Sequence, residues 1–198
     1  MNNLIKFITV VIACLFTGCV APWSYSTRSI ISKPYNSLSI KTPENWYTRQ
    51  VKKIRVFTRN GLSLESITIS RVKWDDTLSN GNQIPSSVLL NQIPEIILGE
   101  YCAKDIAFNL TITDNQIVII DSLPVARTSY KYTSPNSLRM SGIMYCIPFM
   151  NQIAILCYEA ESSYYYVKSV DGFNSMINSI KINSKKYRFL PGILPIKS

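Results

Sequence analysis

Histidine is absent from this chain of 198 residues, and its absence removes most of the catalytic chemistry that the sequence could support. Without imidazole, no Ser–His or Cys–His nucleophile can form, and a common general base and metal ligand is missing. A Ser–Lys pair would remain. However, no Ser-x-x-Lys in the chain carries a supporting motif of such enzymes: Ser129 lies two positions before Lys131, and Ser184 is adjacent to Lys185. The composition therefore favours a protein that is not an enzyme and uses no cofactor.

The acidic residues and cysteines that could bind a metal ion are dispersed along the sequence. Asp75 and Asp76 are adjacent in a segment rich in turn residues, but no third carboxylate follows at the spacing of a cation-binding loop. Cys102, Cys146 and Cys157 do not form a metal-binding motif. We therefore expect no metal site.

The N-terminal cysteine Cys19 has a distinct context. It ends the sequence Leu15-Phe16-Thr17-Gly18-Cys19, after a ten-residue apolar run at 7–16. A transmembrane helix needs about 20 apolar residues, so this run has the proportions of a signal peptide. The five residues resemble the lipobox of bacterial lipoproteins. The resemblance implies a signal peptide at 1–18 that is removed, and a Cys19 that carries fatty acyl chains such as palmitate.

Two other interpretations of this segment are weaker. Ordinary signal-peptidase cleavage after Ala21 would place Pro22 directly after the scissile bond, where proline is poorly tolerated. A buried Cys19 in an uncleaved anchor conflicts with the short apolar run. Val20 follows the cysteine where inner-membrane lipoproteins carry aspartate, so resemblance to enterobacterial sorting implies the outer membrane, with the domain facing the periplasm.

An oxidising compartment would permit a disulfide between Cys146 and Cys157. The two residues would lie opposite each other if their strands turned at Asn151-Gln152. The alternative is that both stay buried thiols, which is the usual state of cysteine in a strand. The sequence leaves both states open.

The mature chain would be strongly basic. The net charge of the whole sequence is +9, and removal of residues 1–18 takes away Lys6 alone, which leaves 20 basic against 12 acidic residues, or +8. Along the run 51–59, alternation places Lys53, Arg55 and Arg59 on one face. This face could bind an acidic partner or anionic headgroups. The alternative is a solvated sheet face that prevents aggregation. Nucleic acid is not an expected partner of an envelope lipoprotein.

Periodicity predicts the elements that would carry these residues. Residues 37–41 should form a first strand. The runs 51–59 and 62–74 should form a hairpin with a type I′ turn at Asn60-Gly61. A loop at 75–85 should precede a helix that begins near Pro94 and ends near residue 107.

The second half of the chain predicts four more strands and a second helix. The strands cover 117–123, 125–133, 138–148 and 152–160, and their short connections favour antiparallel neighbours. Residues 162–180 form an amphipathic helix, followed by a short strand at 181–183. The domain therefore spans 37–183, with a flexible tether at 19–36 and a basic C-terminal tail at 184–198.

Two segments resemble the PsbP-like families. One is Pro43-Glu44-Asn45-Trp46, and the other is Phe173-x-x-Met176-x-x-Ser179-Ile180 at the end of the last helix. The residues Val56–Gly61 and Ile67–Arg71 are similar to uncharacterised proteobacterial lipoproteins of this kind. The resemblance implies an α+β fold, a three-layer α/β/α sandwich in which two main helices flank a central antiparallel sheet.

The resemblance also implies an accessory or binding role without catalytic residues. Our first functional hypothesis is a membrane-anchored envelope lipoprotein that binds another envelope protein through Lys53, Arg55 and Arg59. The alternative hypothesis is a lipoprotein that binds a small ligand or lipid in a pocket between sheet and helix.

Overall fold

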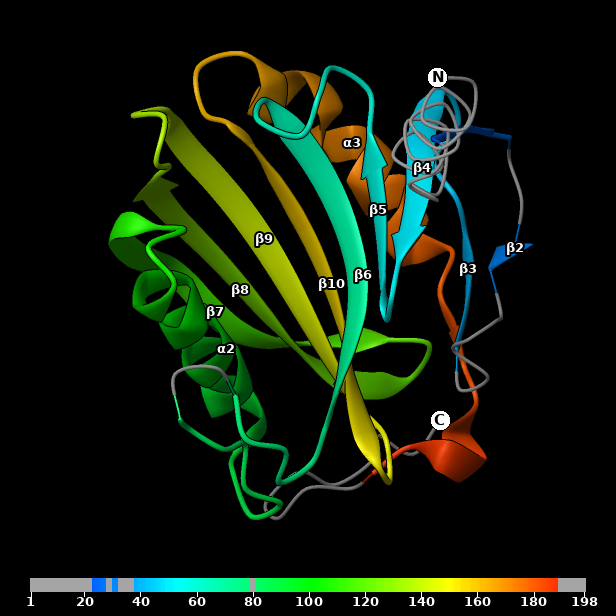
Figure 1. The fold of residues 1–198 in the computed structure, drawn as a ribbon. Coiled ribbons are helices and arrows are strands. Elements are labelled where there is room, and N and C mark those ends of the chain that lie inside the picture. The colour runs from blue at the N-terminus through cyan, green and yellow to red at the C-terminus, as the bar shows by residue number, and fades with distance from the viewer. Residues whose placement is uncertain (1–22, 28–29, 32–37, 79–80, 189–198) are drawn as a thin grey trace, which may run out of the picture.

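The computed structural model describes residues 23–27, 30–31, 38–78 and 81–188. Within these residues, eight strands form one antiparallel sheet in the order β1-β4-β5-β6-β10-β9-β8-β7 (Figure 1). The strands are β1 (Ser24–Ser26), β4 (Trp46–Val51), β5 (Ile54–Thr58), β6 (Glu65–Lys73), β7 (Phe108–Ile120), β8 (Leu123–Thr133), β9 (Arg139–Pro148) and β10 (Gln152–Glu161). A smaller sheet has the order β11-β3-β2, from Lys181–Ile182, Leu38–Lys41 and Ile30–Ile31.

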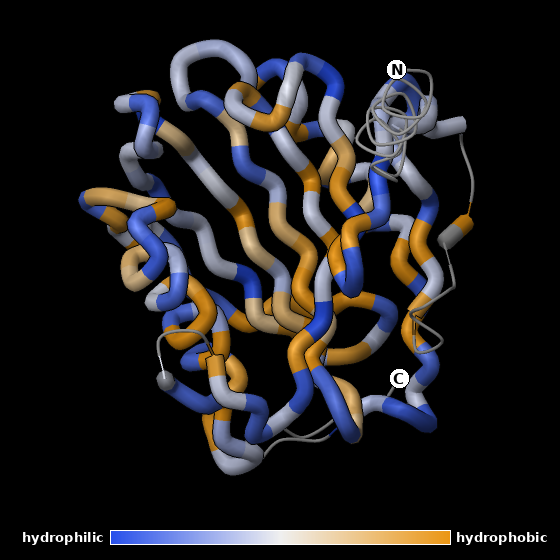
Figure 2. Tube along the Cα trace, viewed as in Figure 1, coloured by the Kyte–Doolittle hydropathy of each residue, from blue (hydrophilic) through white to orange (hydrophobic). Residues whose placement is uncertain are grey.

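Two helices pack on opposite faces of the main sheet, because its central strands are apolar on both faces. On β9, Ile143, Tyr145 and Ile147 belong to one buried cluster, while the alternate residues Met144 and Cys146 belong to another. The helix α3 (Tyr165–Asn178) packs on the first cluster, and α2 (Ile93–Ala103), which follows a 3₁₀ turn at Leu90–Gln92, packs on the second. Figure 2 shows hydrophobic stretches along the central strands of the sheet. The expected α+β class with an antiparallel sheet and two helices is confirmed.

Helix α3 follows the amphipathic pattern closely. Its residues Phe173, Met176 and Ile177 are buried, and Phe173 stacks on Tyr158 of β10 with ring centroids 5.5 Å apart. Burial of each large apolar side chain contributes roughly 2–3 kcal/mol, which is enough to outweigh the cost of Gly172 in the helix interior, about 1 kcal/mol. Helix α2 begins at Ile93, one residue before the expected Pro94, and ends at Ala103 rather than near residue 107. Phe108 begins β7 and is exposed.

The hairpin between β5 and β6 is confirmed, but its predicted turn type is wrong. Asn60-Gly61 does not form a two-residue turn, because the six residues 59–64 connect the two strands. A type I′ turn also needs positive φ at both residues, and only Gly61 of this pair has it. The carbonyl of Gly61 accepts hydrogen bonds from Leu64 and Glu65. A two-residue turn with positive φ at both positions occurs instead at Asp121-Ser122, between β7 and β8.

The expected strand at 51–59 also divides in two. Lys52 adopts φ 52°, so the chain reverses at Lys52-Lys53 and β4 pairs with β5. The result is a meander of three strands, β4, β5 and β6, where the sequence predicted two.

Both flanking segments contribute more to the domain than expected. Within the expected tether at 19–36, Ser24–Ser26 forms β1 and pairs with β4, and Ile30–Ile31 forms β2 and pairs with β3. Within the expected tail, Tyr187 is buried and its hydroxyl donates to the carbonyl of Pro124. Arg188 lies over the Trp74 ring, 4.7 Å from its centroid. The domain therefore reaches at least from residue 24 to residue 188.

Candidate functional site

A groove of about 570 Å³ lies between helix α2 and the strands β6 and β10. Its walls come from the C-terminal half of α2, from β6, from β10 and from the β4–β5 turn. The lining residues are Lys52, Lys53, Ile54, Thr68, Ser70, Arg71, Val72, Ile97, Glu100, Tyr101, Lys104, Ile155 and Cys157. The size lies within the range of small-molecule binding sites, about 300–1,000 Å³.

The groove has an apolar floor and a basic border. Ile97 on α2 and Ile155 on β10 are buried, and Val72 packs against the same cluster. Four of the lining residues are basic and one, Glu100, is acidic, so their net charge is +3. Glu100 forms an i,i+4 ion pair with Lys104, with Nζ and Oε2 2.9 Å apart.

A polar cluster lies next to the inner end of the groove. The Tyr130 hydroxyl donates to Oε1 of Glu159 at 2.7 Å, and the Tyr130 ring packs against Tyr101 and Tyr132. Burial raises the pKa of Glu159, although hydrogen bonds from Tyr130 and Tyr132 oppose the shift. Burial also raises the pKa of Tyr101, Tyr130 and Tyr132. These phenols stay protonated near neutral pH and can act only as hydrogen-bond partners there.

The thiol of Cys157 borders this cluster. Burial raises the pKa of this thiol, and hydrogen bonds that involve Tyr101, Thr68 and Tyr130 oppose the rise. The thiol is therefore a neutral group and not a nucleophile at neutral pH.

The fold makes room for Tyr130 by means of a glycine. Gly142 on β9 lies directly opposite Tyr130 on β8, and a Cβ atom on Gly142 would lie 2.4 Å from the Tyr130 ring. Real Cβ atoms do not approach so closely, so this position accepts glycine alone while Tyr130 keeps its place. The position of Tyr130, and through it the hydrogen bond to Glu159, depends on Gly142.

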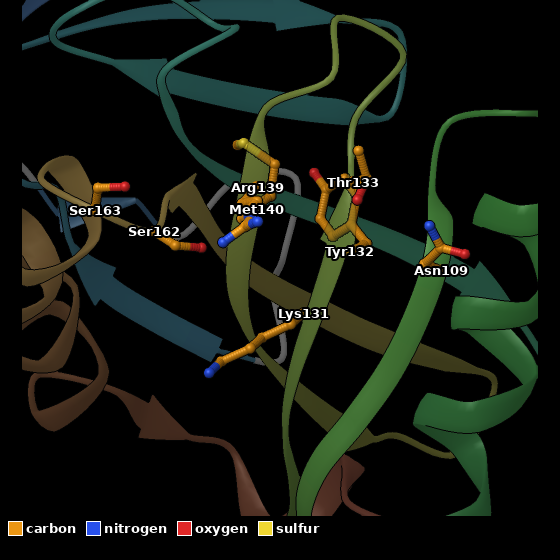
Figure 3. A pocket seen from close by; sticks show the side chains of 8 residues that line it. All are labelled: Asn109, Lys131, Tyr132, Thr133, Arg139, Met140, Ser162 and Ser163. Carbon is orange, nitrogen blue, oxygen red and sulfur yellow. The ribbon is translucent and has the colours of Figure 1, made fainter.

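A second hollow of about 460 Å³ lies at the end of strands β8 and β9 (Figure 3). Two cations and several hydroxyl groups are among its lining residues, which are Asn109, Lys131, Tyr132, Thr133, Arg139, Met140, Ser162 and Ser163. In Figure 3, Lys131 projects from β8, apart from Ser162 and Ser163, while Arg139 and Met140 are successive residues of β9. This hollow is smaller than the α2 groove, and Met140 is the one aliphatic side chain among its lining residues, so the α2 groove is the better candidate for an apolar ligand.

The three basic residues predicted as a binding surface do not form one. Lys53 lies in the β4–β5 turn and lines the α2 groove. Arg55 donates from Nε to Oε1 of Gln50. Arg59 follows the alternation of Arg55 and Phe57 onto the face that carries α3, where its guanidinium donates to Oγ of Ser169 at 2.5 Å. The shared basic face is therefore wrong for Lys53, because the strand begins only at Ile54, whereas Arg55 and Arg59 do lie on one face and Arg59 is held there against α3.

The predicted disulfide partners are free thiols in the structure. The hairpin turns at Met150-Asn151, one residue earlier than expected, which shifts the pairing by two residues. Cys146 therefore lies opposite Ile155, and Cys157 lies opposite Met144. The expected direct opposition of the two cysteines is wrong for this reason.

The predicted lipid anchor, Cys19, lies outside the described residues. In the part of the chain that the structure describes, no helix is long and apolar enough to cross a membrane. Over the same residues, no group of three or more His, Cys, Asp or Glu side chains is placed to hold a metal ion.

Of the groove residues, the sequence singled out Lys53 alone as a candidate site residue. Ile97, Thr68 and Ile155 come from three elements that are far apart in the sequence. The expected pocket between sheet and helix provided the general location. Helix α2 is short relative to the sheet and leaves β6 uncovered on this face. The local sequence does not indicate this gap.

The fold defines a class of protein that is known from solved structures. Neither a family model nor a curated protein matches the chain. The arrangement of sheet and helices is that of the PsbP/Mog1-like fold. This confirms the predicted resemblance at the level of fold.

Three solved structures illustrate this likeness. Cyanobacterial PsbP (CyanoP) from Synechocystis sp. PCC 6803 has a TM-score of 0.58 at 9% identity, over 84% of this chain and 99% of that one. The Ran-binding protein Mog1p from Saccharomyces cerevisiae has a TM-score of 0.53 at 7% identity, over 82% and 99%. The protein of unknown function PA94 from Pseudomonas aeruginosa has a TM-score of 0.50 at 10% identity, over 80% and 99%. At these identities the likeness concerns the fold alone.

Proposed function

We propose that this protein is a non-enzymatic envelope lipoprotein that binds a small amphiphile in the α2 groove, with the domain as a three-layer module anchored through Cys19. The amphiphile has an apolar chain and a negatively charged head. One observation carries the proposal: an apolar floor that includes Ile97 and Ile155 is bordered by lining side chains with a net charge of +3.

The two ends of the groove fit the two parts of such a ligand. Lys52 and Lys53 lie at the β4–β5 turn, and Lys104 follows the end of α2, so these cations border the rim. Apolar contact in the groove gives affinity, while a few placed cations give orientation and selectivity for anions. Cys157 and Tyr101 close the inner end as neutral groups.

Titration calorimetry with dodecyl phosphate, below its micelle concentration, tests this function. Dodecyl maltoside and dodecyltrimethylammonium serve as neutral and cationic comparisons. We expect one molecule of dodecyl phosphate to bind per chain, at least about tenfold more tightly than either comparison, which corresponds to about 1.4 kcal/mol. Equal binding of the three amphiphiles would contradict the role of the cations.

A pair of matched variants locates the site. Ser70 and Ser66 are half-buried serines on β6, and Ser70 lines the groove whereas Ser66 does not. Ser70→Trp should fill the groove and weaken binding at least about tenfold. Ser66→Trp should leave binding unchanged. Unchanged binding by Ser70→Trp would exclude the groove.

The lipid anchor has its own test. Radiolabelled palmitate should be incorporated into the native protein and lost in Cys19→Ser. Incorporation that persists in Cys19→Ser would contradict the anchor.

A protein-binding accessory role is the second candidate. Its support is the fold shared with Mog1p, which is Ran-binding, and the exposed Lys53 beside Arg55. A stoichiometric partner recovered from solubilised membranes, and lost after Lys53→Glu and Arg55→Glu, would favour this role. Arg59 is omitted from that test because it is part of the interior packing.

A further inference from the structure

An exposed apolar strip lies on the face of the sheet that also carries α2, at the edge away from that helix. Tyr25 of β1 is 55% exposed and Tyr47 of β4 is 49% exposed. Their rings pack edge to face with centroids 5.5 Å apart. Val51 and Ile54 at the β4–β5 turn are each 43% exposed. Large apolar side chains gathered at one edge usually mark an interaction surface.

Strand register places these side chains on one face. Tyr25 lies opposite Tyr47, and Val51 lies opposite Ile54. The alternate residue Trp46 points to the other face, where it is buried in the cluster under α3. Trp23, which is 39% exposed, directly precedes β1.

The length of chain before this strip limits where it can lie. Three residues, 20–22, separate Cys19 from Trp23, and an extended chain covers at most about 3.6 Å per residue. If Cys19 carries lipid in the bilayer, Trp23 can stand no more than roughly 14 Å from it. The β1–β4 edge must then lie near the membrane surface.

The chemistry of the strip suits that position. Tryptophan and tyrosine combine an apolar body with a polar tip and concentrate at membrane–water interfaces. The hydroxyl of Tyr25 donates to Oδ1 of Asn45 at 2.7 Å, which holds the side chain at this edge. The exposed Lys52 and Lys53 border the strip and suit anionic headgroups.

We propose that Trp23, Tyr25, Tyr47, Val51 and Ile54 form a membrane-contact surface that holds the β1–β4 edge against an anionic bilayer. This inference rests on the proposed lipid anchor. Ile54, Lys52 and Lys53 also line the α2 groove, so the contact brings the groove rim to the bilayer surface. An amphiphile could then pass between membrane and groove without crossing open water.

Tryptophan fluorescence tests the contact. Trp23 is exposed, while Trp46 and Trp74 are 3% and 9% exposed, so quenchers in the bilayer should reach Trp23 alone. The native lipidated protein is reconstituted into phosphatidylglycerol-containing vesicles with phosphatidylcholine brominated near the headgroup end of its acyl chains. We expect quenching of the emission in the native protein and its loss in Trp23→Phe.

A matched pair of tyrosine variants tests the rest of the strip. Tyr25 and Tyr164 are equally exposed, at 55%, but Tyr164 lies at the start of α3, outside the strip. Tyr25→Ser should reduce the quenching of Trp23 at least about twofold, because loss of the ring weakens the contact. Tyr164→Ser should leave the quenching unchanged.

The outcomes separate the surface from the anchor. Protein that floats with the vesicles but shows no quenching would overturn the membrane-contact surface and leave the anchor intact. Protein that does not float would overturn both. Equal effects of Tyr25→Ser and Tyr164→Ser would also contradict the strip as defined.

Discussion

Arg59 and Glu65 form an ion pair inside the domain, with Nε and Oε1 3.5 Å apart. The Glu65 side chain is fully buried, whereas that of Arg59 is 35% exposed. Asn60 also donates to Oε1 of Glu65, and the Arg59 guanidinium lies 5.5 Å from the centre of the Trp46 ring. This arrangement joins the β5–β6 connection to α3, so Arg59 stabilises the fold.

Replacement of Arg59 should therefore destabilise the protein. Arg59→Gln leaves the Glu65 carboxylate buried without its cation, and we expect a loss of roughly 2–3 kcal/mol, below the ~3–5 kcal/mol of fully buried pairs because Arg59 is partly exposed. Urea unfolding measures the change. Arg55→Gln is the control and should cost under about 1 kcal/mol. Equal losses for the two variants would contradict the structural role of Arg59.

Two glycine-to-alanine changes should have opposite effects. In Gly142→Ala the new Cβ would collide with the Tyr130 ring, and we expect a loss of about 1–3 kcal/mol. In Gly172→Ala the new Cβ meets no atom within 4 Å inside α3, and helix propensity predicts a gain of about 0.5–1 kcal/mol. Thermal unfolding of both variants checks the difference in sign. A stabilising Gly142→Ala would show that Tyr130 does not need this space.

Glu159 should make stability fall as pH rises. Burial raises its pKa above the ordinary value of 4.5, so the folded protein holds this proton more tightly than the unfolded chain. The free energy of unfolding should decrease from about pH 4.5 up to the raised pKa. Glu159→Gln removes this loss, so the variant should gain stability over the native protein as pH rises through that window.

Glu161 provides a control of opposite sign for this experiment. Hydrogen bonds from the Ser163 side chain and backbone lower the pKa of Glu161. The ionised Glu161 therefore stabilises the folded protein above the ordinary pKa range of carboxyl groups, and this stabilisation is lost as pH falls. Glu161→Gln should therefore be less stable than the native protein at neutral pH, and the difference should shrink in acid. Parallel curves for both variants and the native protein would contradict the assignment.

The three cysteines of the domain should differ in reactivity. Cys102 is exposed, while burial raises the pKa of Cys146 and Cys157. In the mature protein with Cys19 acylated, a thiol reagent at pH 8 should modify Cys102 alone while the protein is folded. After denaturation without reductant it should modify three thiols. A single reactive thiol after denaturation would show that Cys146 and Cys157 are bonded.

The elements of the fold were largely predictable because their signals are local. The amphipathic pattern of α3 and the hairpins of β8, β9 and β10 follow from periodicity and turn residues. The register was not predictable to the residue. Because the turn lies one position earlier than expected, Cys157 pairs across the strands with Met144 and not with Cys146. Nothing in the residues around Met150 specifies which turn forms.

The candidate site was predictable only as a location between sheet and helix. Arg59 lies on the same face as Phe57, as alternation predicts, but the local sequence does not show that α3 and the buried Glu65 cover Arg59 on that face. Such long-range partners leave no mark in local sequence. The same holds for β1, whose three residues become a strand only because β4 offers an unpaired edge.

The central claim is that the α2 groove binds an anionic amphiphile, and the methyl NMR spectrum of isoleucine tests it most directly. Ile54, Ile97 and Ile155 line the groove, whereas Ile67 and Ile177 belong to the cluster on the opposite face. On titration with dodecyl phosphate we expect the first three methyl resonances to shift and saturate together, while the other two stay unchanged. Shifts of Ile67 and Ile177 without those of Ile97 and Ile155, or no shifts at all, would contradict the account.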